Sequence, residues 1–135
     1  MSMSKPKKGK ERELVCLAYV AAKEQPSQWI EEVERKQINY IRDYARAHNI
    51  QIKSIIHRAE LGAHEANRQF EYMIKRIQAG EVAGIIVANM MVIANDIADA
   101  YYKVGRVNAA GGCMVTVEEG KLRLNLKERC GYERH

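Results

Sequence analysis

The stretch that decides the fold runs from Leu14 to Gln25 and reads Leu-Val-Cys-Leu-Ala-Tyr-Val-Ala-Ala-Lys-Glu-Gln. Its apolar run is short and rich in branched and aromatic side chains, which is typical of a strand buried on both faces. Such strands belong to parallel sheets, whose ligand sites lie just beyond the carboxyl ends of the strands. The segment from Ala22 to Gln25 is therefore where chemistry is expected, and Lys23 is its conspicuous residue.

The composition is that of a single globular domain: 135 residues, 47% of them hydrophobic and 29% charged. No apolar run approaches the ~20 residues of a membrane helix, and no signal-like segment follows the N-terminus. We therefore expect a soluble, cytoplasmic protein with no membrane partner. The three cysteines include no C-x-x-C and the four histidines no His-x-x-x-His, so we expect no metal and no cofactor.

The formal charge of +5 is unevenly distributed, because basic residues crowd the N-terminus. Such a cluster can hold nucleic-acid phosphates through counterion release, but a solvated leader that only aids solubility explains it equally well. The candidate DNA-binding residues there are Lys5, Lys7, Lys8, Lys10 and Arg12. We expect a disordered basic tail over residues 1–12, a folded domain over 13–127 and an irregular tail over 128–135.

Three segments after the first strand carry apolar residues at helical spacing. They run from Trp29 to about His48, from Arg68 to Gln78 and from about Ile93 to Ala109. Ser27 is a candidate N-cap for the first of them, on whose apolar side Gln37 is an unexpected polar residue. The third segment is marked by Ile93, Ile97, Tyr101 and Val104.

The segments between these helices predict the other strands and a loop. Strands are expected over residues 50–56, 82–87 and 113–117, and the polar stretch 57–67 is expected to be a loop. A tight turn at 118–121 leads into alternating leucines over 122–126, which predicts an antiparallel hairpin at the sheet edge. The expected fold is a single three-layer α/β domain in the order β-α-β-α-β-α-β-β, with a mostly parallel sheet.

No phosphate-cradling glycine loop follows the first strand, and no G-x-S-x-G occurs. Several other features do occur in a specific order. They are Tyr19 near the end of the first strand, Gln37 in the first helix, Gly62 in the loop, Arg68 at the start of the second helix, and Ala79-Gly80-Glu81-Val82 before the third strand. In that order they resemble the catalytic domain of resolvase/invertase-type serine recombinases, from about Leu14 to Lys127.

The resemblance implies a resolvase-like fold and a link to DNA recombination. In that family a serine attacks a DNA phosphodiester while arginines neutralise the phosphate. The corresponding positions have changed here, because Ala21 and Lys23 stand for the arginine and serine of Tyr-x-Arg-x-Ser, Asn67 for an aspartate, and Met90 and Ile93 for two further arginines. Of the nucleophile and the main cationic groups, only Arg68 is retained.

These departures predict a catalytically inactive domain. Loss of one preorganised electrostatic group typically costs ~10²-fold or more in rate, and a protonated lysine is not a nucleophile. We expect the domain to act by binding a recombinase partner, itself or, nonspecifically, DNA, with Lys23 and Arg68 as candidate phosphate ligands. Two alternatives stay open: an active serine recombinase fragment with a displaced active site, and a flavodoxin-like small-molecule-binding domain.

Overall fold

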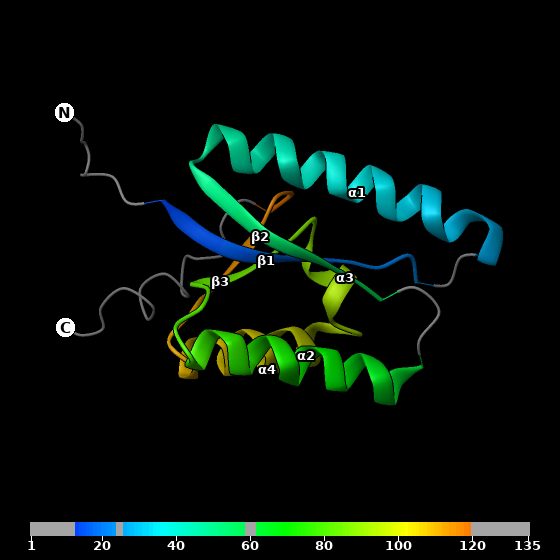
Figure 1. Ribbon diagram of the computed structural model, residues 1–135. Helices are drawn as coiled ribbons and strands as arrows, with labels where there is room; N and C mark the ends of the chain where they lie inside the picture. The colour runs from blue at the N-terminus through cyan, green and yellow to red at the C-terminus, as the bar shows by residue number, and fades with distance from the viewer. Residues whose placement is uncertain (1–12, 24–25, 59–61, 120–135) are drawn as a thin grey trace.

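The computed structural model describes residues 13–23, 26–58 and 62–119 (Figure 1). In chain order its eight elements are β1 (Leu14–Val20), α1 (Ser27–Ala47), β2 (Ile50–His57), α2 (Ala63–Gln78), β3 (Gly84–Val87), α3 (Met90–Ile93), α4 (Ile97–Ala109) and β4 (Cys113–Thr116). None of the helices in these ranges combines the length and the apolar character needed to cross a membrane.

The four strands of the described ranges form one sheet in the order β2-β1-β3-β4, and every neighbouring pair is parallel. β1 is central and buried from Cys16 onward, as its uninterrupted apolar run predicted. The chain passes from β1 to β2 on one side and later to β3 on the other. The carboxyl ends of β1 and β3 therefore form the topological switch point, where ligands of such sheets bind.

The expected antiparallel hairpin is not seen in the described part of the chain. Its second strand, residues 122–126, lies outside the described residues, and β4 pairs in parallel with β3. The sheet that can be described is therefore entirely parallel and not mixed. The expected α/β class is confirmed.

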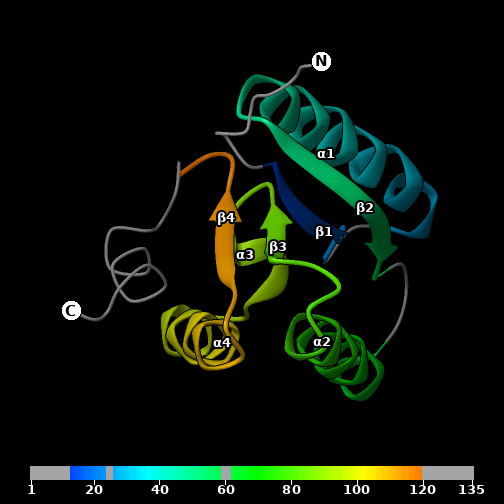
Figure 2. The same cartoon turned by 60° about the vertical axis from the view of Figure 1, so that its left-hand side comes forward.

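The two faces of the sheet are covered by different helices (Figures 1 and 2). α1 lies along one face, where Ile41 joins Cys16, Ala18 and Val20 of β1 in a small core. α2, α3 and α4 cover the opposite face, where the larger core lies. Alternate side chains of β1 enter the two cores because successive strand residues point to opposite faces. Both faces of β1 are therefore buried from solvent, and the chain leaves the core at the carboxyl end of this strand.

The start of α2 differs from the expectation. The helix begins at Ala63, and β2 continues to His57, so the predicted loop over 57–67 is largely absorbed by its neighbours. No helix breaker interrupts the sequence between Gly62, which is the N-cap, and Gly80, which follows the helix. Helix formation therefore extends to the nearest glycine on each side.

The start of α1 also differs, by one residue. Pro26 occupies the N-cap position, no side chain caps the helix, and Ser27 is its first residue. The predicted capping role of Ser27 is therefore wrong. Pro26 has φ of −59°, which suits the entry to a helix, and its carbonyl oxygen accepts a hydrogen bond from the backbone N–H of Trp29.

The predicted third helix is two helices. The side chains of Asn89 and Asp96 accept hydrogen bonds from the N–H groups of Met91 and Asp99, so α3 and α4 each have their own N-cap. The break between them resets the helical phase. Ile97 and Tyr101, expected on the buried stripe, are each 72% exposed.

Candidate functional site

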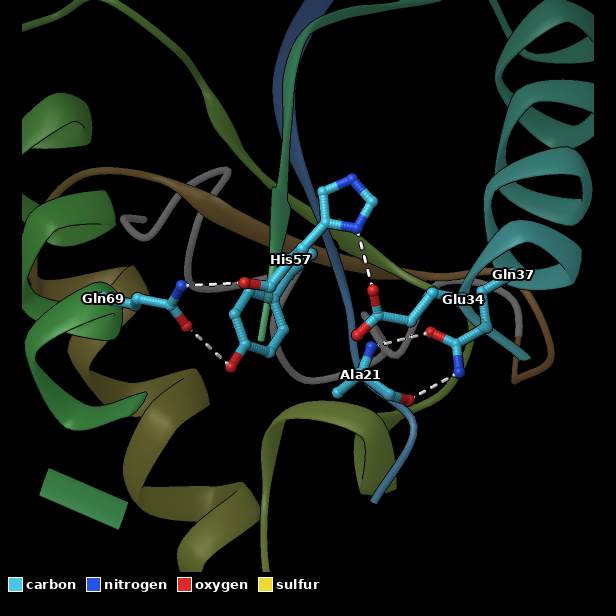
Figure 3. A network of polar contacts seen from close by, with 6 residues as sticks. Ala21, Glu34, Gln37, His57 and Gln69 are labelled. Atoms are coloured by element: carbon cyan, nitrogen blue, oxygen red, sulfur yellow. Dashed lines mark hydrogen bonds and ion pairs between the residues drawn. The ribbon is translucent and has the colours of Figure 1, made fainter. Parts of the chain in front are cut away.

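The end of β1 is held by a glutamine from α1 (Figure 3). Nε2 of Gln37 donates to the carbonyl oxygen of Ala21 at 2.7 Å, and the backbone N–H of Ala21 donates to Oε1 of Gln37 at 3.0 Å. Ala21 is buried and lies just past the end of the strand, so its backbone groups need such partners. This pairing explains why a polar residue lies on the apolar side of α1, and it fixes the direction in which Lys23 leaves the sheet.

A second polar network links α2, β2 and α1 (Figure 3). Oε1 of Gln69 accepts a hydrogen bond from the Tyr19 hydroxyl at 3.2 Å, and Nε2 of Gln69 donates to the His57 carbonyl at 2.9 Å. Nδ1 of His57 lies 2.8 Å from Oε1 of Glu34, whose side chain is buried. Four elements, β1, α2, β2 and α1, are therefore joined at the carboxyl edge of the sheet.

Burial raises the pKa of Tyr19 to about 12, although the Arg58 charge acts in the opposite direction. The phenol is therefore protonated at neutral pH and serves as a hydrogen-bond donor to Gln69.

A small polar cavity of about 70 Å³ lies at the switch point, bounded by the end of β1, the start of α2 and the α3–α4 segment. Part of its wall is apolar, formed by Phe70, Val92 and Ile93. The polar side chains that line it are Tyr19, Lys23, Arg58, Asn67, Asn95 and Lys103. We refer to this space as the switch-point cavity.

Three cations reach the switch-point cavity from three different elements. Nζ of Lys23, after β1, donates to the carbonyl oxygen of Ala94 at 2.6 Å. Nζ of Lys103, on α4, lies 2.7 Å from Oδ2 of Asp99, and Lys103 is only 7% exposed. Arg58, directly after β2, is half-buried, and its guanidinium makes no hydrogen bond or ion pair with any described residue. Positive charge is therefore gathered in a partly enclosed space.

Asp99 is the acid that contacts these cations within the described ranges. Burial raises the pKa of its carboxyl group, but the hydrogen bonds from Lys103 and from the Asn95 N–H lower it by more. The net shift is downward, so Asp99 is ionised at neutral pH and compensates Lys103.

Some of the predicted site residues meet at the switch-point cavity. Tyr19, Lys23, Asn67 and Ile93 line it. Two others, Ala21 and Met90, are buried in the larger core and present no polar group to a ligand.

Gln37 and Arg68 face different surfaces. Gln37 lines a separate groove of about 530 Å³ between α1 and the ends of β3 and β4. Arg68 lies on the outer side of α2, with its side chain 69% exposed and 3.5 Å from Glu65, in an open groove of about 370 Å³. Lys23, Gln37 and Arg68 thus do not converge on one pocket. The predicted DNA-binding tail, Lys5 to Arg12, lies outside the described residues.

Arg58 and Lys103 are cavity residues that the sequence reasoning missed. A signal existed for Arg58, because it comes just after the second predicted strand, and parallel strands of one sheet end at the same edge. For Lys103 the available signal is its position on α4, four residues after Asp99 and on the same side of the helix as the buried Val107. Within the described ranges, no three metal-ligating side chains gather at this cavity or elsewhere.

Two solved structures with a similar arrangement are serine recombinases. A resolvase family site-specific recombinase from Streptococcus pneumoniae matches with a TM-score of 0.66 and 18% identity, over 80% of this chain and 74% of that one. The C-terminal catalytic domain of ISC1926 TnpA, an IS607-like serine recombinase, matches with a TM-score of 0.61 and 18% identity, over 77% and 70%. No family model and no curated protein matches the sequence. The chain therefore has the fold of resolvase-family serine recombinase catalytic domains, as the resemblance implied.

Proposed function

We propose that this chain is a resolvase-like domain linked to DNA recombination that acts by binding and does not cleave DNA covalently. The supporting observation is the lining of the switch-point cavity, whose described residues include no serine, threonine or cysteine. The hydroxyl present there belongs to Tyr19. With a pKa of about 12, roughly one phenol in 10⁵ is ionised at pH 7.

Lys23 does not replace the missing serine. It stands at the position that the family resemblance assigns to the nucleophile, and its Nζ donates to the Ala94 carbonyl. An ammonium group that donates a hydrogen bond has no lone pair with which to attack phosphorus. Ser27, the nearest serine in the sequence, is exposed on the first turn of α1 and does not line the cavity.

DNA contacts in this proposal come from exposed cations and give sequence-independent affinity. Arg68 and Lys75 line the outer groove of α2 together with Tyr72. The ion pair of Arg68 with Glu65 is exposed and therefore weak, so it leaves the guanidinium able to contact a phosphate. The proposed partners are DNA, a recombinase-family protein or a second copy of this chain.

An adduct-trapping assay tests the proposal. The protein is incubated with supercoiled plasmid and with labelled duplex DNA, quenched in detergent, and examined for nicks and for covalent protein–DNA adducts. We expect salt-sensitive retention of DNA with neither nicks nor adducts. An adduct would refute the proposal and establish the alternative of an active recombinase with a displaced site. Stabilisation by a nucleotide without any DNA retention would instead establish the small-molecule-binding alternative.

Matched variants locate the DNA surface. Arg68→Gln should lower the salt dependence of DNA retention by about one phosphate contact. Arg46→Gln is the control, because Arg46 on α1 is similarly exposed and similarly paired, with Asp43 three residues away. Equal effects of both variants would refute the α2 surface. Deletion of residues 1–12 should remove most retention at low salt, and survival of retention would exclude the basic tail as the footprint.

A further inference from the structure

We propose that the outer surface of α2 and α4 binds a single-stranded nucleic acid, whose unpaired bases stack on two exposed tyrosines. We refer to it as the tyrosine surface, and it is formed by Tyr72, Lys75 and Arg76 of α2 and by Tyr102 and Arg106 of α4. The inference rests on the proposed function in one respect, namely that the chain binds nucleic acid. It adds the form of nucleic acid that is bound and the kind of contact that binds it.

The two helices that carry the tyrosines are fixed to each other. They lie side by side on one face of the sheet (Figures 1 and 2). The Arg106 guanidinium of α4 holds the Glu71 carboxylate of α2 by two hydrogen bonds, of 2.6 and 2.7 Å. The same guanidinium donates to the Tyr102 hydroxyl at 3.1 Å, and Glu71 directly precedes Tyr72 in the chain. One arginine therefore links the turn of α2 that carries Tyr72 to the side chain of Tyr102.

Both tyrosine rings are exposed and restrained. Tyr72 and Tyr102 are 53% and 56% exposed. Cζ of Arg76 lies 5.1 Å from the centre of the Tyr72 ring, and Cζ of Arg106 lies 5.9 Å from the centre of the Tyr102 ring. A guanidinium over a ring is attracted by the π electrons and limits how the ring turns. Each ring is therefore held in place while more than half of the residue faces solvent, so a base that stacks on it has less conformational entropy to remove.

Tyr72 borders the open groove of about 370 Å³ on the outer side of α2. Pockets for drug-sized ligands measure roughly 300–1,000 Å³, so the groove has the size for one nucleotide. The amide of Asn67 and the ring of His64 also line it and can form hydrogen bonds with the edge of a base. Lys75 lines it as well and supplies a cation for the adjoining phosphate. The groove thus offers contacts for the face of a base, for its edge and for its phosphate.

Stacking on these tyrosines requires unpaired bases. In a duplex each base is covered on both faces by its neighbours, so a ring on the protein surface cannot reach a base face. In a single strand the faces are accessible, and stacking on an aromatic side chain tolerates every base. Acids adjoin the arginines of the tyrosine surface, because Arg76 pairs with Glu81 and Arg106 pairs with Glu71. The net positive charge is therefore small, and stacking should supply more of the affinity than phosphate attraction does.

A protein is the other kind of molecule that a surface of tyrosine and arginine can bind. The rings that dominate protein interfaces lie in well-packed, fully desolvated pockets. The groove beside Tyr72 is instead open and has polar groups along it, among them those of Asn67 and Lys75. Such a lining suits a base with a polar edge and a phosphate better than it suits an apolar side chain of a protein.

Fluorescence anisotropy with the full chain tests the tyrosine surface. The probes are a labelled single strand of mixed sequence and the duplex that it forms with its complement. Tyr72→Leu and Tyr102→Leu should each weaken single-strand binding about fivefold or more, because each removes a ring and keeps an apolar side chain. Tyr72→Phe keeps the ring and should retain the affinity. Tyr40→Leu is the matched control, because Tyr40 is similarly exposed but lies on α1, over the opposite face of the sheet.

The inference is supported if both leucine variants of the tyrosine surface lose single-strand affinity while duplex binding and Tyr40→Leu change by less than about twofold. The salt dependence of binding should stay unchanged in these variants, since no phosphate contact is removed. An equal loss in Tyr40→Leu, a parallel loss of duplex binding, or a loss in Tyr72→Phe as large as in Tyr72→Leu would overturn the inference. Reduced self-association of Tyr72→Leu with single-strand binding intact would assign the surface to a protein contact and would also overturn it.

The two proposals fail separately. Retention of duplex DNA, with single-strand binding that does not respond to the tyrosine variants, would refute the tyrosine surface and leave the proposed function standing. Covalent protein–DNA adducts, with single-strand binding lost in both leucine variants, would refute the proposed function and leave the tyrosine surface standing.

Discussion

Replacement of Gln37 by methionine should destabilise the fold without removing apolar contacts. Methionine has nearly the same length as glutamine but can neither donate to the Ala21 carbonyl nor accept from the Ala21 N–H. Each buried backbone group left without a partner costs about 1–3 kcal/mol. Because Gln37 lines an open groove that water can enter, we place the sum near the low end, at about 2–3 kcal/mol.

Urea unfolding measures this difference as a shift of the midpoint at constant slope. The control is Gln28→Met, since Gln28 is an exposed glutamine of the same helix. Its change should stay within about 0.5 kcal/mol. If Gln37→Met and Gln28→Met unfold at the same midpoint, the amide does not hold the end of β1, and the account of how Lys23 is directed into the cavity is wrong.

Further predictions concern two glycines and one ion pair. A Cβ at Gly84 would lie 2.1 Å from the Cys113 carbonyl oxygen, so Gly84→Ala should cost at least about 1–3 kcal/mol. Gly105 has open space around it on α4, and Gly105→Ala should instead stabilise by about 0.5–1 kcal/mol; the opposite order in urea unfolding would contradict both assignments. The hydrogen bond from Arg106 lowers the pKa of Glu71. The contribution of this ion pair to folding stability is therefore present above the unfolded-state pKa of Glu71 and is lost as pH falls through the folded-state pKa. The side chains of Arg106 and Glu71 are 32% and 47% exposed, so Glu71→Gln should lower the free energy of unfolding by less than about 1 kcal/mol at pH 7. This difference from the wild type should vanish in acid. A pH-independent difference would show that the pair contributes through packing.

Local sequence patterns determined much of the fold. The apolar run of β1, the alternation of helices and strands and the helix stops were all predictable, because each depends on residues adjacent in the chain. Asn49, Gly80 and Gly111 adopt positive φ values of 57°, 80° and 94° where the sequence placed helix ends. These residue types tolerate the left-handed conformation that ends a helix.

Only part of the switch-point cavity could be predicted from local sequence patterns. Lys23 was identified because a strand end in a parallel sheet is a recognisable position in sequence. Arg58 and Lys103 are 35 and 80 residues further along the chain, by difference of their numbers. They come together with Lys23 because β2 pairs beside β1 and because α4 packs across the opposite face. Local periodicity does not encode either arrangement.

Tertiary structure also determined where the side chains of the predicted site residues lie and what they contact. The family resemblance made Arg68 and Lys23 joint candidates for phosphate binding, but Arg68 lies on the side of α2 opposite its buried residues and so on the outer face of that helix. It identified Gln37 as out of place, but only the position of α1 over the end of β1 supplied its two backbone partners. A hydrophobic pattern predicts which face of an element is buried. Which residues that face contacts is determined by the order of the strands and the packing of the helices, and this order and packing depend on contacts between residues far apart in the chain.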